Sequence, residues 1–159
     1  MKYNINDILD VLSESTISSL YNNHPELFTE KPNDIKTFYH LSKHVKTKLT
    51  PKIYNSEFED KTTPRVCVST SIQGCLIGIN EDKDITGEIF HVYEVTSDKW
   101  YDPSTKEVAD CKLTGEVWIL EECIPKHVYD IKITGIELYK KWNFNGNEFR
   151  VPIWKYVKI

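Results

Sequence analysis

Residues 37–41 have the sequence Thr-Phe-Tyr-His-Leu, and the pattern of the chain changes at this point. The aromatic and β-branched side chains of this stretch favour a β-strand. Before it, apolar residues recur three or four positions apart over residues 5–22, which predicts an amphipathic helix. His24-Pro25 is expected to end that helix, because the residue before a proline avoids the helical conformation. We therefore expect an N-terminal helical segment (1–34) followed by a β-rich core (35–159).

After residue 41, strand-like patterns alternate with loops. Strands are predicted at 65–69, 88–95, 116–121 and 128–138, and a helix at 72–79 that Ser71 could cap. Loops are predicted at 43–64, with a short strand at 52–54, and at 100–110. A short turn is predicted at 25–30. In the tail, 141–159, Asn145-Gly146 predicts the turn of a β-hairpin. These elements predict a single α+β domain over residues 1–159.

The composition is that of an ordinary globular protein. A length of 159 residues is usual for one domain, and a hydrophobic content of 40% is enough for a core. The net charge is −4 and the lysines are scattered, whereas a nucleic-acid-binding protein normally carries a basic stripe. The acidic run at 81–84 lacks the ligand spacing of a calcium loop and predicts a solvated loop. Non-specific nucleic-acid binding is therefore not expected.

The cysteines and the hydropathy pattern indicate the cellular setting. No two of the 4 cysteines, at positions 67, 75, 111 and 123, are separated by two residues, as they are in zinc knuckles. The N-terminus lacks the pattern of a signal peptide, and no apolar run approaches the ~20 residues needed to cross a bilayer. We expect a soluble cytoplasmic protein with reduced thiols, no structural metal site and no membrane partner.

Common catalytic motifs are absent from the sequence. It contains no glycine-rich phosphate loop, no His-Glu-x-x-His motif and no Gly-x-Ser-x-Gly elbow. A nucleophilic pair could combine the thiol of Cys67 or Cys75 with one of the histidines at 40, 44, 91 and 127. No local signature supports such a pair, and an inert buried thiol is the favoured interpretation.

Six short segments follow one another in an order known from one protein family. They are 38–42 (Phe-Tyr-His-Leu-Ser), 49–51 (Leu-Thr-Pro), 65–72 (Arg-Val-Cys-Val-Ser-Thr-Ser-Ile), 90–95 (Phe-His-Val-Tyr-Glu-Val), 102–103 (Asp-Pro) and 115–118 (Gly-Glu-Val-Trp). This order, over residues 36–135, resembles the small rifampin ADP-ribosyltransferases and, more loosely, the ADP-ribosyltransferase superfamily. The resemblance implies a split, bent, antiparallel-rich β-sheet that clamps NAD⁺ in a cleft.

The resemblance also implies which residues bind NAD⁺. The histidine of the family's first strand, which hydrogen-bonds the adenosine ribose, matches His40, and Ser42 takes the place of a neighbouring hydroxyl residue. On the next strand the family has an aromatic residue that stacks on nicotinamide, but this chain has Cys67 there. Tyr54 or Tyr93 is expected to supply the ring instead.

Further residues are implied near the nicotinamide ribose. Ser69 begins a junction rich in serine and threonine like that of the family, although the junction also fits a simple helix cap. The acidic residue that stabilises positive charge as the glycosidic bond breaks matches either Asp102 or Glu116. Glu116 is favoured because a strand holds a side chain more firmly, whereas Asp102-Pro103 also fits an ordinary turn.

Three functions follow as hypotheses. The first is an NAD-dependent mono-ADP-ribosyltransferase, a glycosyltransferase that acts on an unknown protein, nucleic-acid or small-molecule acceptor without a metal. The second is a non-catalytic binding or inhibitor protein on the same scaffold, encoded by a phage or mobile element. The third is a hydrolase of a nucleotide or ADP-ribose in the same cleft. The sequence leaves the oligomeric state and the role of the N-terminal helix open.

Overall fold

The computed structural model describes residues 2, 20–21, 23–27, 36–55, 59–79 and 83–159. Most of the helix predicted at 5–22 therefore lies outside the described residues; Leu20, Tyr21 and Asn23 are helical. A 3₁₀-helix, η1 (Pro25–Leu27), occupies the start of the short turn predicted at 25–30. No helix within the described ranges is long and apolar enough to span a membrane.

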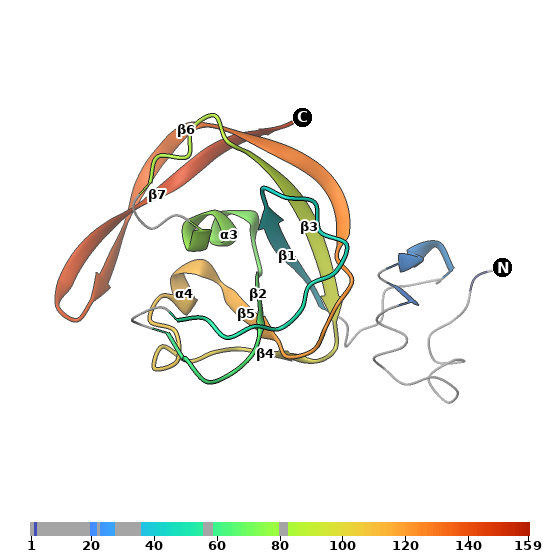
Figure 1. Cartoon of the computed structure of the whole chain (residues 1–159). Helices are drawn as coiled ribbons and strands as arrows, with labels where there is room; N and C mark the ends of the chain where they lie inside the picture. The colour runs from blue at the N-terminus through green and yellow to red at the C-terminus, as the bar shows by residue number, and fades with distance from the viewer. Residues whose placement is uncertain (1, 3–19, 22, 28–35, 56–58, 80–82) are drawn as a thin grey trace.

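The core is a seven-stranded sheet in which every neighbouring pair is antiparallel (Figure 1). Its strands are β1 (Lys36–Ser42), β2 (Val66–Ser69), β3 (Ile89–Ser97), β4 (Trp100–Tyr101), β5 (Glu116–Ile119), β6 (Lys126–Phe144) and β7 (Asn147–Lys158). The strand order is β4-β5-β2-β1-β3-β6-β7. Two helices, α3 (Ile72–Ile79) and α4 (Cys111–Thr114), complete the described core. The predicted α+β class with a mainly antiparallel sheet is confirmed.

The sheet is strongly curved, and β3 and β6 arch over α3 (Figure 1). β1 is paired with β3 along its whole length, from Lys36↔Ser97 to Ser42↔His91. Its pairing with β2, on the other side, is recorded at Tyr39↔Ser69 alone. The two halves of the sheet are therefore joined by a short contact between β1 and β2.

Hydrophobic clusters pack on both faces of the sheet, and β1 contributes a buried residue to each of them. Leu41 belongs to a cluster with Leu76 of α3 and Trp154 of β7. Phe38 belongs to a second cluster, which includes Leu49 from the loop after β1. α3 thus covers one face and the 43–54 loop lies against the other, so the short β1–β2 contact is enclosed between them.

α3 has the predicted bounds and the predicted cap. The hydroxyl of Ser71 accepts a hydrogen bond from the backbone N–H of Gly74 at 2.9 Å, which satisfies one of the unpaired donors at the start of the helix. The amide of Gln73 extends from α3 to β7: its oxygen accepts from the Trp154 N–H and its nitrogen donates to the Trp154 carbonyl. These bonds fix α3 inside the curve of the sheet.

Several sequence predictions need correction. The predicted loop at 100–110 begins with strand β4, and its end leads into α4, which the pattern did not indicate. The short strand predicted at 52–54 is a single bridge between Lys52 and Arg65. The predicted strand at 128–138 and the tail hairpin form one longer pair, because β6 runs from Lys126 to Phe144 and stays paired with β7 across two register shifts. The turn at Asn145-Gly146 is confirmed, with φ of 49° and 75°.

Candidate functional site

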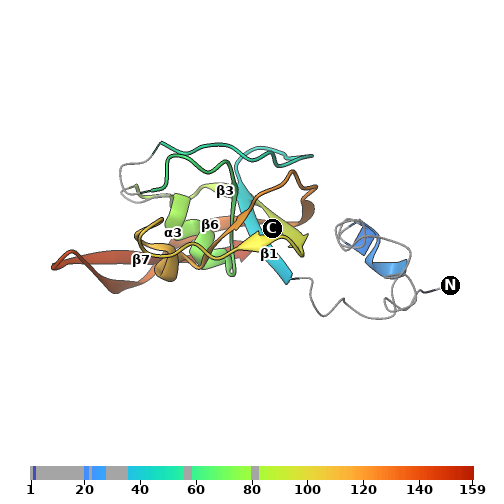
Figure 2. The same cartoon turned by 90° about the horizontal axis from the view of Figure 1, so that it is seen from below.

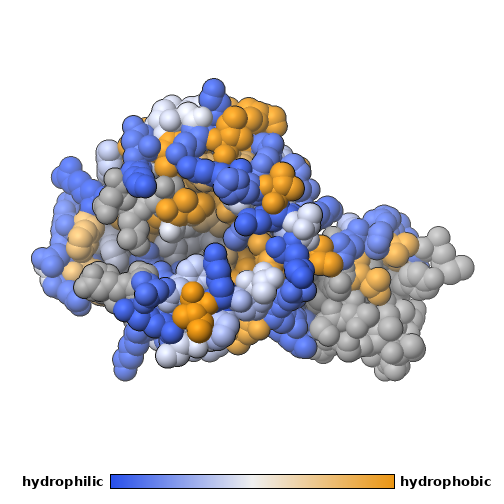
Figure 3. All heavy atoms as spheres, in the orientation of Figure 1, coloured by the Kyte–Doolittle hydropathy of each residue, from blue (hydrophilic) through white to orange (hydrophobic). Residues whose placement is uncertain are grey.

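A pocket of about 240 Å³ lies between α3 and the strands on either side of the β1–β2 contact. Four of the seven residues predicted to bind NAD⁺ or to act in catalysis line it: His40, Tyr54, Ser69 and Glu116. They come from β1, the following loop, β2 and β5, which are far apart in the chain. Figure 3 shows a hollow in the molecular surface at the level of α3 and α4.

Glu116 is the first residue of β5, and the sheet register determines its neighbours. Its Oε1 accepts a hydrogen bond from Trp118 Nε1 at 2.8 Å and a second from Cys67 Sγ at 3.3 Å. Trp118 lies two residues further along β5, on the same face, and Cys67 is the cross-strand partner of Trp118. The carboxylate is therefore held by paired strands, which position a side chain more rigidly than a loop.

His40 extends from β1 toward β2. Its Nδ1 lies 3.2 Å from the carbonyl oxygen of Cys67, and because a carbonyl only accepts, Nδ1 carries the hydrogen. Burial lowers the pKa of His40, and the charges of Lys46 and Lys52 act in the same direction. The ring is therefore neutral at pH 7, and its Nε2 is a hydrogen-bond acceptor.

A buried arginine supports the pocket from behind. The guanidinium of Arg65 stacks 5.0 Å from the ring centroid of Tyr54 and 4.2 Å from that of Trp118. It is completely buried, pairs with Glu59 Oε2 at 3.0 Å and donates to two backbone carbonyls. Burial raises the pKa of Tyr54, so its hydroxyl stays a neutral donor. Arg65 is not among the residues predicted for the site, although a charged residue beside an apolar strand was a signal.

The thiols near the pocket are protonated. Burial, followed by the nearby Glu116 carboxylate, raises the pKa of Cys67 to about 12, and burial raises that of Cys75 to about 12. Cys75 Sγ donates to the carbonyl of Tyr39. His40 contacts the backbone oxygen of Cys67, and that thiol donates to Glu116 instead. The described contacts thus do not form the Cys–His pair considered above for these residues.

Ser69 lines the pocket but also holds two elements together. Its hydroxyl donates to the carbonyl of Thr114 at 2.6 Å and accepts from the N–H of Ser71. A Cβ at Gly74 would overlap the same carbonyl of Thr114 and the hydroxyl of Ser69. This tight contact of β2, α3 and α4 forms one wall of the pocket.

The structure does not bring the other three predicted residues into this pocket. Tyr93 is buried beside His40, with ring centroids 6.5 Å apart, and its hydroxyl accepts from the N–H of Lys46. Ser42 lies at the end of β1, where its hydroxyl accepts from the backbone of residue 44. Asp102 is exposed directly after β4. None of the three is among the residues that line the pocket.

The pocket combines three different polar groups: an imidazole acceptor at His40, a phenol donor at Tyr54 and a carboxylate at Glu116. Such a set can bind the hydroxyl groups of a sugar, and the carboxylate can stabilise positive charge that develops on a ligand. No protein-family model, curated protein or solved structure matches the chain.

Proposed function

We propose that this chain is an NAD⁺-dependent mono-ADP-ribosyltransferase with an ADP-ribosyltransferase-like fold. The observation that carries the proposal is that His40, Tyr54 and Glu116 line one pocket beside the short β1–β2 contact. In this proposal Glu116 is the catalytic carboxylate, His40 binds a hydroxyl of the adenosine ribose through Nε2, and the ring of Tyr54 replaces the aromatic residue absent at Cys67.

The proposed reaction is a substitution at C1′ of the nicotinamide ribose. The bond between C1′ and the pyridinium nitrogen breaks, its electron pair stays on nitrogen, and neutral nicotinamide leaves. Glu116 accepts a hydrogen bond from the 2′-hydroxyl and stabilises the ribosyl cation. A lone pair of the acceptor then forms the new bond to C1′, and the acceptor's proton passes to water.

The size of the pocket restricts how NAD⁺ binds in this proposal. Its volume of about 240 Å³ is below the roughly 300–1,000 Å³ typical of ligand pockets. We therefore expect it to enclose the nicotinamide–ribose part, while the adenine lies outside its mouth.

Release of nicotinamide from labelled NAD⁺ tests this function. Glu116→Gln is expected to lower kcat by about a hundredfold or more, since its amide cannot stabilise the cation as a carboxylate does. His40→Ala is expected mainly to raise KM. Glu148→Gln changes an exposed residue of the β6–β7 hairpin, outside the pocket. It is the matched control and should leave both kcat and KM unchanged. Equal release by the wild type and both pocket variants would refute the proposal.

The competing acidic residue is tested in the same assay. Asp102→Asn removes the exposed carboxylate that follows β4. If Asp102→Asn abolishes nicotinamide release while Glu116→Gln does not, the catalytic carboxylate is Asp102 and the assignment to the pocket is wrong.

A second candidate function, the non-catalytic binding protein, is favoured by the β6–β7 hairpin. Beyond Lys132, β6 is paired with β7 alone, and this ribbon projects from the sheet in both views (Figures 1 and 2). Leu138, Tyr139 and Phe149 are exposed on it. A binding protein should show no thermal shift with NAD⁺, whereas a true NAD⁺ site stabilises the fold by mass action.

The hydrolase hypothesis is tested by analysing the products of the reaction. Transfer leaves ADP-ribose attached to an acceptor, whereas hydrolysis releases it.

A further inference from the structure

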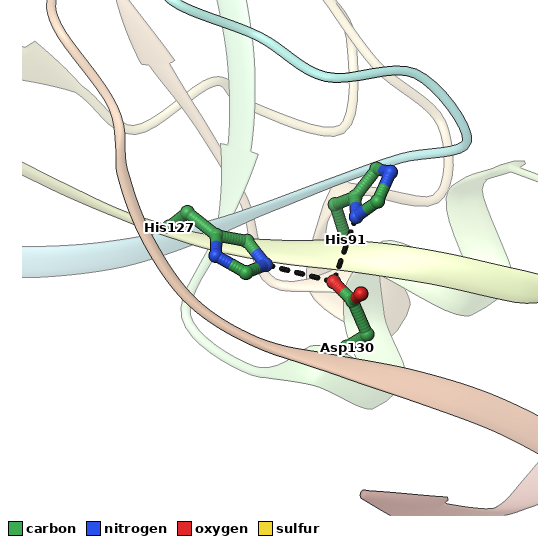
Figure 4. A group of neighbouring side chains, drawn as sticks. All are labelled: His91, His127 and Asp130. Atoms are coloured by element: carbon green, nitrogen blue, oxygen red, sulfur yellow. Dashed lines mark hydrogen bonds and ion pairs between the residues drawn. The ribbon is translucent and has the colours of Figure 1, made fainter. Parts of the chain in front are cut away.

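Three side chains with metal-ligating atoms converge outside the pocket, on β3 and at the start of β6 (Figure 4). Oδ1 of Asp130 lies 2.7 Å from His91 Nδ1 and 2.7 Å from His127 Nε2. The ligating atoms of all three residues lie within 4.8 Å of one another. Among the described residues, this is the one group of three or more such side chains that could hold an ion.

A β-bulge creates this convergence. His91 is the cross-strand partner of Asp130, so these two side chains share a face of the sheet. His127 lies three positions before Asp130, and strict alternation would place it on the opposite face. A register shift makes His127 the partner of Tyr93, with Val128 as the extra residue. Bulges commonly redirect a side chain next to functional sites, and this one aligns all three groups.

We propose that His91, His127 and Asp130 bind a divalent transition-metal ion of the Zn²⁺ class. Two imidazole nitrogens and one carboxylate oxygen form a mixed ligand set that such ions prefer, whereas Ca²⁺ and Mg²⁺ prefer oxygen ligands alone. The carboxylate offsets one of the two positive charges. Three protein ligands leave a coordination position open, as in catalytic rather than structural zinc sites.

In the hydrogen-bonded arrangement both imidazoles donate to Oδ1 of Asp130, so their ligand atoms already point at one place. A neutral imidazole can carry its hydrogen on either ring nitrogen, so an ion can replace these hydrogen bonds and take the lone pair of the nitrogen that now faces Asp130. The ring of Tyr93 packs against both, with centroids 6.5 Å from His91 and 5.6 Å from His127. The side chains of His127, Asp130 and His91 are 50%, 30% and 26% exposed, which gives an ion access from solvent.

The metal proposal does not depend on transferase activity. The pocket and the cluster touch through the rings of His40 and Tyr93, but they share no ligating residue. Either proposal can fail while the other stands.

Titration calorimetry of the full chain with ZnCl₂ tests the site, followed by Co²⁺ titration with visible absorption as a readout of coordination. The wild type is expected to bind one equivalent of Zn²⁺. His127→Asn and Asp130→Asn should each weaken Zn²⁺ binding by about tenfold or more. Mutating a residue that only hydrogen-bonds to a metal ligand already costs about 10–100-fold in metal affinity. The matched control is His24→Asn, which removes an exposed histidine paired with a single carboxylate, Glu26, and should leave affinity unchanged.

Melting temperatures measured without metal show whether each variant is folded. His127 is half-exposed, so His127→Asn is expected to melt within a few degrees of the wild type. The proposal is overturned if the wild type binds no Zn²⁺, if a folded His127→Asn binds it with unchanged affinity, or if His24→Asn loses binding as strongly as His127→Asn does.

Discussion

Two carboxylates of this sheet have the same hydrogen-bond pattern in different surroundings. Glu116 accepts two hydrogen bonds on one oxygen, from the indole of Trp118 and the thiol of Cys67. Asp130 also uses one oxygen for two contacts, with the imidazoles of His91 and His127. The partners of Glu116 are buried or half-buried strand residues, whereas His127 is half-exposed.

The difference lies in what each pair of partners can do. An indole does not titrate, and the Cys67 thiol, with a pKa raised to about 12, stays protonated near neutral pH. Imidazole is the side-chain type that changes charge between about pH 5 and 8, and it binds metals. The two hydrogen-bond donors to Glu116 therefore keep their protons near neutral pH. The two side chains beside Asp130 are instead of the type that binds metal ions.

The largest effect is expected from removing the cation behind the pocket. Arg65→Ala removes the ion pair with Glu59 and empties the space beside the rings of Tyr54 and Trp118. We expect the free energy of unfolding, measured by urea denaturation, to fall by about 3–5 kcal/mol. Arg150→Ala, at an exposed position of β7, is the control and should change it by less than about 0.5 kcal/mol. Equal losses in both variants would contradict a supporting role for Arg65.

The second prediction concerns the reactivity of Cys67. Its pKa of about 12, compared with about 8.5 for a free thiol, reduces the thiolate fraction on the order of a thousandfold. A more basic thiolate is also more nucleophilic, which recovers part of that loss. Alkylation by iodoacetamide in the native protein should therefore be about a hundredfold slower than in urea, as measured by peptide mass spectrometry. Alkylation at the same rate in both would show an ionised thiol and would restore the Cys–His interpretation.

Much of the fold could be predicted because local patterns agree with the final packing. The stretch at 37–41 lies within β1, the helix at 72–79 is α3, and Asn145-Gly146 forms the predicted turn. β4 was missed because it has two residues, too few to show a period, and pairs with β5 only in the folded sheet. The four residues of α4 are equally short.

The candidate site was predictable only in part, for the same reason. His40 and Glu116 lie within strands, so local sequence placed them on rigid elements. Arg65 acquires its role through Tyr54 and Trp118, which come from other segments of the chain. The cluster around Asp130 depends on a register shift in β6, and such a shift is set by pairing with β3. No local pattern carries that information.

The third prediction tests how closely the wall of the pocket is packed. Gly74→Ala would place a Cβ against the backbone carbonyl of Thr114, which cannot rotate away. We expect a loss of about 1–3 kcal/mol in the free energy of unfolding. Gly78→Ala lies on the same helix, with the nearest atom 4.0 Å away, and should stabilise the protein by about 0.5–1 kcal/mol. If the two variants shift the urea midpoint in the same direction, the wall is not tightly packed.

The smallest effect is expected at Asp130, and it depends on pH. Hydrogen bonds from His127 and then His91 lower the pKa of Asp130 in the folded protein. Its unfolded value is about 3.9, so the carboxylate stabilises the fold above that pH, and this stabilisation is lost as pH falls through the folded pKa. Asp130→Asn should therefore cost about 0.5–1 kcal/mol at neutral pH, as for other exposed ion pairs, and nothing in strongly acid solution. Urea denaturation of the wild type and Asp130→Asn from neutral to strongly acid pH measures this dependence, and a cost that does not shrink in acid would contradict the stabilisation of the Asp130 carboxylate by its two imidazole neighbours.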